Sequence, residues 1–180
     1  MTIKADDKSF LVSFETAVLQ PVRINNKIYT RVTNISGEST TIGKKPYDIV
    51  RQSCAYYGST FQQAKQLSKD TLGNYLKLPI VVAHDYGNPF ILIPLLSPKS
   101  DLNVWFSLKA IERLEASEGG CTVVLTNGAK ITVNSSIVTL SKQVGFANLL
   151  NTHFLKRMSR LSHNEFITSR NQFFQKEFQD

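Results

Sequence analysis

The clearest hydrophobic pattern in the chain lies between residues 46 and 72 and predicts two short helices joined by a tight turn. Apolar or aromatic side chains in its first half recur at spacings of three, four and three residues, the period of one helical stripe: Tyr47, Val50, Cys54 and Tyr57. Pro46 suits the first helical position because the N–H that it lacks would have no partner there. Gly58 can close the first helix, and Ser59 or Thr60 can cap the second.

Before this helical unit, alternating apolar residues predict strands over residues 10–33. The alternation begins between Phe10 and Phe14, and the dipeptide Asn25-Asn26 separates two β-prone runs in the manner of a hairpin turn. Residues 34–43 are rich in turn formers and predict a loop.

After the unit, two strongly apolar runs, 79–84 and 89–96, predict a pair of strands joined by a turn at residues 85–88. Both runs are apolar at consecutive positions, so we expect a central pair that is buried on both faces. Pro94 predicts a sheet edge or a bulge at the end of the second strand, because proline cannot donate to a ladder.

The C-terminal third predicts a hairpin followed by helices. Residues 121–133 alternate on both sides of Asn127-Gly128, which favours a two-residue turn, and weaker strand patterns precede them at 104–108 and 112–116. From about Thr139 the period becomes helical, with one apolar stripe: Ala147, Leu150, Phe154, Met158 and Leu161. Ser162 and Glu165 resemble a capping box that opens a last short helix, to about Phe178.

Together these patterns predict a single domain over residues 1–180 of the α+β class. It would have a mainly antiparallel sheet, a short helical unit in the first half and C-terminal helices. The length suits one domain with a real core, and 42% hydrophobic with 19% charged residues are globular values.

The charge is uneven along the chain. The net charge of +7 comes from 21 basic and 14 acidic residues. Residues 41–77 carry six basic and two acidic groups, and residues 121–180 carry seven and three, so each segment has a net charge of +4. Basic clusters attract polyanions by neutralising phosphates. A basic surface also keeps many proteins soluble without binding nucleic acid, so charge alone leaves both interpretations open.

The sequence offers little for catalysis or metal binding. Five residues separate Gly37 from Gly43, which is one more than a phosphate-binding loop has, and the three histidines lack the spacing of a metal site. No Gly-x-Ser-x-Gly elbow is present. We therefore expect no enzyme activity, no catalytic residues, no metal and no cofactor, and favour a binding protein.

No apolar run is long enough to span a bilayer, and acids near the N-terminus do not suit a signal peptide. We therefore expect a cytoplasmic protein that makes no membrane contact. Cys54 and Cys121 would then be reduced, with Cys54 a small buried hydrophobe rather than a nucleophile.

Several segments in one order resemble the ComK family of competence transcription factors from low-GC Gram-positive bacteria. They are IVRQSCAYYGST (49–60), LPIVV (78–82), FILIPLLS (90–97), Trp105 and TVVLTNGAKITV (122–133). The resemblance covers roughly residues 44–158, whereas 1–43 and 159–180 match weakly. It is carried by several blocks at similar gaps, which is more specific than one motif.

The resemblance implies a transcriptional activator, associated with the nucleoid, that promotes competence (DNA-uptake) genes. It would recognise double-stranded AT-rich promoter boxes mainly through the minor groove, as a homodimer or higher assembly on adjacent boxes. A narrow AT-rich minor groove has enhanced negative potential, which attracts Lys and Arg. The resemblance also implies contact with RNA polymerase and with an adaptor that delivers the protein to a Clp protease.

This sequence departs from the family pattern at three places where the family tends to have arginine: Gln52, Ala55 and Ala64-Lys65. Fewer phosphate contacts are expected to lower affinity and flatten its salt dependence. The C-terminal segment NEFITSRNQFF also lacks the family's adaptor motif beyond its Phe166.

The predicted DNA-binding residues form two groups. The first group lies in and around the helical unit, and we favour it: Lys44, Lys45, Arg51, Tyr56, Lys65 and Lys69. The second group lies on the polar side of the C-terminal helix: Lys156, Arg157 and Arg160. Each group could instead be a solvated helix face. For Tyr47 and Tyr57 we expect core packing.

Two other modes of action fit the same residues. The two helices around Gly58 could form a helix-turn-helix unit that reads the major groove. Alternatively, the protein could be a regulatory module whose basic surface binds an acidic protein partner without DNA. We also expect that the apolar stripe between residues 147 and 161 could contribute to a homodimer.

Overall fold

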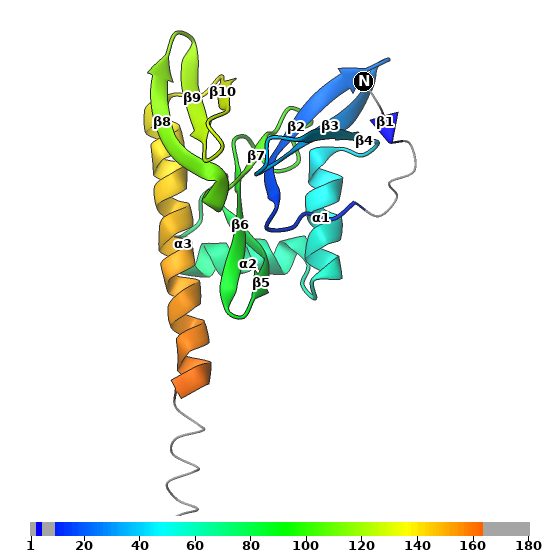
Figure 1. Ribbon diagram of the computed structural model, residues 1–180. Coiled ribbons are helices and arrows are strands. Elements are labelled where there is room, and N and C mark those ends of the chain that lie inside the picture. The colour runs from blue at the N-terminus through cyan, green and yellow to red at the C-terminus, as the bar shows by residue number, and fades with distance from the viewer. Residues whose placement is uncertain (1–2, 5–9, 164–180) are drawn as a thin grey trace, which may run out of the picture.

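The computed structural model describes residues 3–4 and 10–163 and is shown in Figure 1. Its larger sheet has seven strands in the order β1-β4-β3-β2-β7-β6-β5, and its smaller sheet has the order β10-β9-β8. All strand pairs are antiparallel except β1–β4. The strands are β1 Ile3–Lys4, β2 Thr16–Ile24, β3 Lys27–Asn34, β4 Ser39–Ile42, β5 Ile80–Asp85, β6 Asn88–Pro94, β7 Trp105–Ser107, β8 Ile111–Ser117, β9 Gly120–Leu125 and β10 Lys130–Val133.

Three α-helices pack against these sheets: α1 Pro46–Tyr56, α2 Phe61–Leu72 and α3 Ile137–His163. The predicted α+β class with a mainly antiparallel sheet, a helical unit in the first half and a C-terminal helix is confirmed. In Figure 1, α1 and α3 lie on opposite sides of the β5–β6 hairpin, with α2 passing between them. No helix of the described residues is both long and apolar enough to cross a membrane.

The helical unit forms as the sequence predicts. Thr60 accepts a hydrogen bond from the backbone N–H of Gln63, whose side chain accepts one from the backbone N–H of Thr60, so a capping box starts α2. Gly58 has φ +89°, a conformation that favours glycine and lets the chain turn sharply between the helices.

The hairpin predicted at Asn25-Asn26 is also confirmed. Both asparagines have positive φ, 47° and 61°, as a two-residue turn between twisted strands requires. The turn at Asn127-Gly128 differs from the prediction. Gly128 has φ +82° and its N–H donates to the Leu125 carbonyl, while the Leu125 N–H donates to the Ala129 carbonyl, so three residues form the loop. Glycine supplies the one left-handed position that this longer loop needs.

Two assignments in the first 43 residues are wrong. No strand begins at Phe10, because residues 10–15 cross the end of the sheet with the Val12 N–H bonded to the Ser53 hydroxyl on α1 instead of to a neighbouring strand. Residues 34–43 are not simply a loop, because β4 pairs with β3 through Thr40, Thr41 and Ile42. The β-branched side chains of that short segment suit a strand, but the turn-forming residues before them led to the prediction of a loop.

The strand pair at 79–96 forms, but only β6 is central. β5 is the edge strand of the larger sheet, and its first three residues are buried because α1 and α2 cover Ile80 and Val82 while Val81 packs with the apolar stripe of α3. Pro94 ends β6 with a partner on one side only, Trp105 of β7, because the β5 ladder stops at the Ile80–Leu92 pair. That side of β6 is locally an edge at Pro94, as predicted, whereas the irregularity of the ladder falls in β5 between Val81 and Ala83. The runs of consecutive apolar residues therefore predicted burial correctly and strand order incorrectly.

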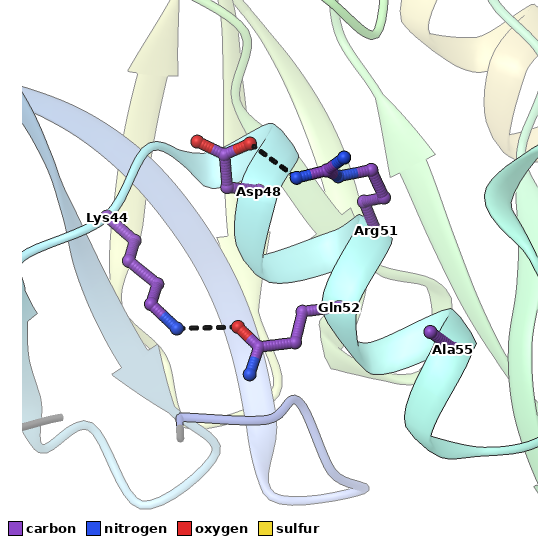
Figure 2. A pocket seen from close by; sticks show the side chains of 5 residues that line it. All are labelled: Lys44, Asp48, Arg51, Gln52 and Ala55. Carbon is purple, nitrogen blue, oxygen red and sulfur yellow. Dashed lines mark hydrogen bonds and ion pairs between the residues drawn. The ribbon is translucent and has the colours of Figure 1, made fainter. Parts of the chain in front are cut away.

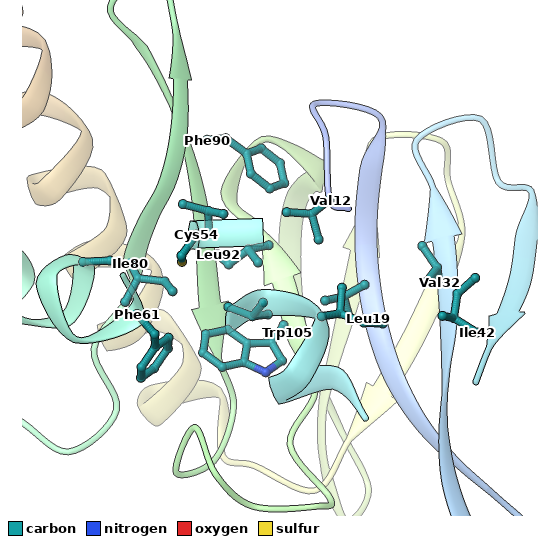
Figure 3. Close-up of a cluster of buried hydrophobic side chains, with 14 residues drawn as sticks. Val12, Leu19, Val32, Ile42, Cys54, Phe61, Ile80, Phe90, Leu92 and Trp105 are labelled. Atoms are coloured by element: carbon teal, nitrogen blue, oxygen red, sulfur yellow. The ribbon is translucent and has the colours of Figure 1, made fainter. Parts of the chain in front are cut away.

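Trp105 lies at the centre of the main core, between α1, α2 and the larger sheet (Figure 3). It is fully buried and meets Phe61 of α2 edge to face, with ring centroids 6.4 Å apart. Cys54 is also fully buried in this core, and burial raises the pKa of its thiol to about 11. The prediction of an unreactive buried cysteine agrees with this environment.

The apolar stripe of α3 is buried in part. Ala147, Leu150 and Phe154 pack under β5 and β6, whereas Leu161 is 75% exposed. The hairpin tip reaches α3 at Met158, since a Cβ placed on Gly87 would lie 3.3 Å from the Met158 side chain. Leu161 lies past that contact, and Figure 1 shows α3 continuing beyond the hairpin. The last helix predicted from Ser162 to Phe178 falls mostly outside the described residues.

Candidate nucleic-acid interface

The chain passes from β4 into α1 through Lys44 and Lys45, the first two cations of the first predicted group. The hydroxyl of Thr30, on β3, donates to the carbonyl oxygen of Lys44 over 2.7 Å and so fixes the segment that enters the helix. Lys45 is the N-cap residue, with extended backbone angles, and Pro46 takes the first turn. The two lysines are thus held just before the first turn of α1.

One depression, of about 530 Å³, runs along the exposed side of α1 (Figure 2). Its lining residues are Lys44, Asp48, Arg51, Gln52 and Ala55. The Lys44 ammonium donates to the Gln52 amide oxygen, and the Arg51 guanidinium lies 3.6 Å from the Asp48 carboxylate. Both side chains extend along the surface of the helix rather than into the core.

A second depression, of about 490 Å³, adjoins the amino end of the same helix. It is lined by Lys45, Tyr47, Asp48, Arg51, Gln62, Lys99 and Asp101. Lys45 donates to both carboxylate oxygens of Asp101, over 2.9 and 3.0 Å. Asp48 and Arg51 line both depressions, so the two form one continuous basic surface, which we call the α1 surface.

The sequence did not single out Lys99 or Asp101 for this surface. They lie more than 40 residues after the end of α1, in the connection between β6 and β7, and no periodic pattern links them to it. Across the α1 surface four cations, Lys44, Lys45, Arg51 and Lys99, stand against the carboxylates of Asp48 and Asp101. The surface keeps a positive balance, but less than the sequence segment alone suggests.

The other predicted residues of the first group are placed less uniformly. Gln62 lines the second depression, and Lys65 and Lys69 follow it along α2 at helical spacing, both half-buried. Ala64 is 3% exposed and packs in the main core, so this departure from the family pattern does not lie on the surface. Gln52 and Ala55, the other two departures, lie in the first depression beside Lys44 and Arg51.

The two tyrosines of α1 and Tyr57, its C-cap residue, occupy different environments. Tyr47 packs edge to face on Phe61, with centroids 5.1 Å apart, as the prediction of core packing requires. Tyr57 is 41% exposed, and its hydroxyl donates to the Val12 carbonyl over 2.8 Å, so core packing describes it only in part. Tyr56 is 70% exposed at the end of the helix and remains a candidate for contact with a ligand.

The second predicted group lies elsewhere on the molecule. Lys156, Arg157 and Arg160 are exposed on the distal half of α3, across the β5–β6 hairpin from α1 (Figure 1). Residues 137–163 contain no Asp or Glu at all, so no acid within the helix offsets these charges. The fold does not bring the two groups together.

The α1–α2 pair also has the connectivity of a helix-turn-helix unit, with a four-residue connection through Gly58. Exposed glutamines occupy the first turns of α2, where a recognition helix usually contacts base edges: Gln62, Gln63 and Gln66. Gln63 is occupied by the capping box, and Gln66 donates to Asp70 over 2.8 Å. Gln62 is therefore the first of these residues that could meet a base.

Within the part of the chain that the structure describes, no group of three or more His, Cys, Asp or Glu side chains could hold a metal ion.

Comparison with known proteins gives two findings. The family model described as "ComK protein" matches residues 7–159. A curated protein from Bacillus subtilis (strain 168), described as "Competence transcription factor", is 28% identical over 153 residues, which cover 84% of this chain and 78% of that protein. No solved structure matches significantly. Residues 7–159 include both depressions, all three helices almost to their ends, the first group of cations, and Lys156 and Arg157 of the second group.

Proposed function

The chain belongs to the ComK family, and from this membership we propose that it is a DNA-binding transcriptional activator of competence genes. The relative described as a competence transcription factor supports this proposal, because the similarity extends over most of both chains. The observation that carries the proposal is the family match over residues 7–159 together with the basic α1 surface that those residues form.

The proposed ligand is double-stranded AT-rich DNA, bound mainly through the minor groove. The α1 surface supports this choice because its lysines and arginine are long, exposed at their ends and held on a rigid helix and its cap. Such side chains suit the enhanced negative potential of a narrow AT-rich groove. Because that groove carries a degenerate base code, specificity would depend on the spacing of paired boxes and on paired protomers.

In this proposal Lys44, Lys45 and Arg51 contact phosphates or the groove floor. Tyr56 lies at the end of the same helix, and Lys65 with Lys69 would extend the contact along α2. Lys156, Arg157 and Arg160 would flank the site in a homodimer. The apolar stripe itself is not available to a second protomer at Ala147, Leu150 and Phe154, which are buried. A homodimer contact on α3 would therefore involve its exposed residues, such as Leu155 and Leu161.

Other proposed partners follow from the role rather than from a mapped surface. An activator must communicate with RNA polymerase, and a DNA-bound regulator would associate with the nucleoid in the cytoplasm. Control by a Clp-protease adaptor is a further proposal; the NEFITSRNQFF segment that bears on it lies outside the described residues.

Gel-shift titrations with AT-rich and GC-rich duplexes of equal length test the proposed function. The protein should prefer the AT-rich duplex, and a small molecule that fills the AT-rich minor groove should compete with it. Binding should weaken steeply with salt, because phosphate contacts release counterions. Absence of binding to either duplex at low salt would reject the proposal in favour of a protein-binding module.

A second candidate mode is major-groove reading by α2, which the row of glutamines favours. A glutamine can make a bidentate contact to adenine in the major groove. In that mode, methyl or bulky groups placed in the major groove should block binding, whereas the minor-groove competitor should leave it unchanged. Gln62→Ala should then relax base preference, with a loss of about 1–3 kcal/mol at one position of the site.

A further inference from the structure

We propose that the depression at the amino end of α1 is a phosphate-binding site for the DNA backbone, and that Asp101 holds its main cation, Lys45, until DNA displaces it. The inference rests on the proposed function and assigns a role to two residues, Lys99 and Asp101, outside the helical unit. It explains why a surface with a positive balance carries an acid against one of its cations.

The depression has the donors that a phosphate requires. Lys45 and Arg51 come from α1 and its cap, Lys99 comes from the β6–β7 connection, and Gln62 adds an amide from α2. Cations and amides converging from three segments suit the oxygens of a phosphate diester better than the edge of a base. The amino end of a helix adds a partial positive charge, and Lys45 leaves that end without a side-chain cap.

Asp101 occupies the place that a phosphate would take on Lys45. Its two carboxylate oxygens lie 2.9 and 3.0 Å from the Lys45 ammonium, although the two residues are 56 positions apart. Two anionic oxygens on one ammonium reproduce the charge and the spacing of a phosphate contact. The pair is therefore a tertiary contact that the fold builds, in contrast to the local Asp48–Arg51 pair at three residues' separation.

The connection that carries Asp101 is held together by hydrogen bonds of its own. The Ser100 N–H donates to the Ser97 carbonyl, and the Asn103 N–H donates to the Ser100 carbonyl. Asn103 is fully buried, and its side-chain oxygen accepts from the Leu96 N–H over 2.7 Å. These bonds hold the backbone on both sides of Asp101, so its carboxylate is positioned rather than swinging freely at the surface.

The pair is nevertheless easy to open. The Lys45 and Asp101 side chains are 48% and 51% exposed, so water replaces either partner readily. An exposed ion pair of this kind changes an equilibrium by about two- to fivefold at most. Because DNA must displace Asp101 whatever its base sequence, the pair lowers affinity for all duplexes by the same factor and limits binding to non-specific DNA.

The test compares Asp101→Asn with Glu118→Gln by fluorescence anisotropy on AT-rich and GC-rich duplexes. Both variants remove one negative charge, but Glu118 lies in the β8–β9 turn, away from the depression. Asp101→Asn should tighten binding to both duplexes by about two- to fivefold relative to Glu118→Gln, with the ratio between duplexes unchanged. Lys99→Gln should weaken binding to both.

A double-variant cycle assigns the effect to Lys45. In the Lys45→Gln background, Asp101→Asn should have little effect, because the cation that it releases is gone. The inference is overturned if Asp101→Asn binds no more tightly than Glu118→Gln. It is also overturned if Asp101→Asn weakens binding, since Asp101 would then be a positioning residue for Lys45. In either case, binding of the wild-type protein to AT-rich DNA would leave the proposed function intact. Failure of the wild type and of Asp101→Asn to bind either duplex would overturn both.

Discussion

Neutralising three cations of the α1 surface together, in the variant Lys44→Gln/Lys45→Gln/Arg51→Gln, should weaken binding to AT-rich DNA by about 1–3 kcal/mol. The structure limits this magnitude. Lys45 is already paired with Asp101, and Arg51 lies 3.6 Å from Asp48, so part of each phosphate contact replaces an existing surface pair. Such pairs are worth about 0.2–1 kcal/mol each, which is why the expected loss is smaller than for three unpaired cations.

Salt dependence gives a second and more specific measurement of the same variant. Each phosphate contact that the variant removes should reduce the slope of log affinity against log salt by about 0.9, or about 2.7 for three contacts. Between about 50 and about 200 mM salt, the wild type should therefore lose about 40-fold more affinity than the variant. Anisotropy titrations at several salt concentrations measure both the affinity and the slope.

The matched control is Lys156→Gln/Arg157→Gln/Arg160→Gln, which removes the same charge from the distal half of α3. If it binds AT-rich DNA poorly while the α1 variant binds normally, the interface lies on α3 and the assignment is reversed. Both variants should unfold at nearly the wild-type denaturant concentration, since five of the substituted side chains are exposed and Lys44 is only half-buried. A large loss of stability in either variant would show that the binding defect is a folding defect.

Three further predictions concern the scaffold that holds the α1 surface. Thr60→Ala should lower the free energy of unfolding by about 1 kcal/mol in urea titrations, because it removes half of the capping box of α2. Trp105→Ala should cost about 3–5 kcal/mol in the same assay, since the ring is fully buried in the main core. The folded pKa of Cys54, about 11, lies above its ordinary value of 9.0, so the unfolded state loses its proton first and stability should fall as pH rises from 9.0 to 11. This fall of up to about 2–3 kcal/mol should be absent from Cys54→Ser, and an equal fall in that variant would contradict the assignment.

The elements that the sequence predicted well are those whose signals are local. The capping box at Thr60, the glycine turn at Gly58 and the asparagine turn at Asn25-Asn26 each depend on backbone angles or hydrogen bonds within a few residues. Such features need no knowledge of the rest of the fold. The helical unit and the first hairpin could therefore be assigned without the structure.

Strand order and helix coverage depended on distant segments and were predicted less well. The apolar run of β5 predicted burial, but it could not show whether a strand or a helix provides the cover. Likewise, Leu161 continues the periodic stripe of α3 although the β5–β6 hairpin ends before it. Periodicity shows which side of an element is apolar, and only the tertiary fold decides how far along the element that side is covered.

The charges of the candidate site also divide into a local feature that the sequence predicts and a tertiary pairing that it does not. The sequence placed Lys44, Lys45 and Arg51 together because they lie within eight residues, and the family resemblance pointed to the same segment. It counted them as three available cations, whereas the fold brings Asp101 onto Lys45 from 56 residues away. A net charge summed over a segment therefore overestimates the positive charge that is available to a polyanion at the surface. The relevant quantity is the charge left after tertiary pairing, and on the α1 surface that pairing can be removed by a single substitution whose effect on DNA binding has a predicted sign.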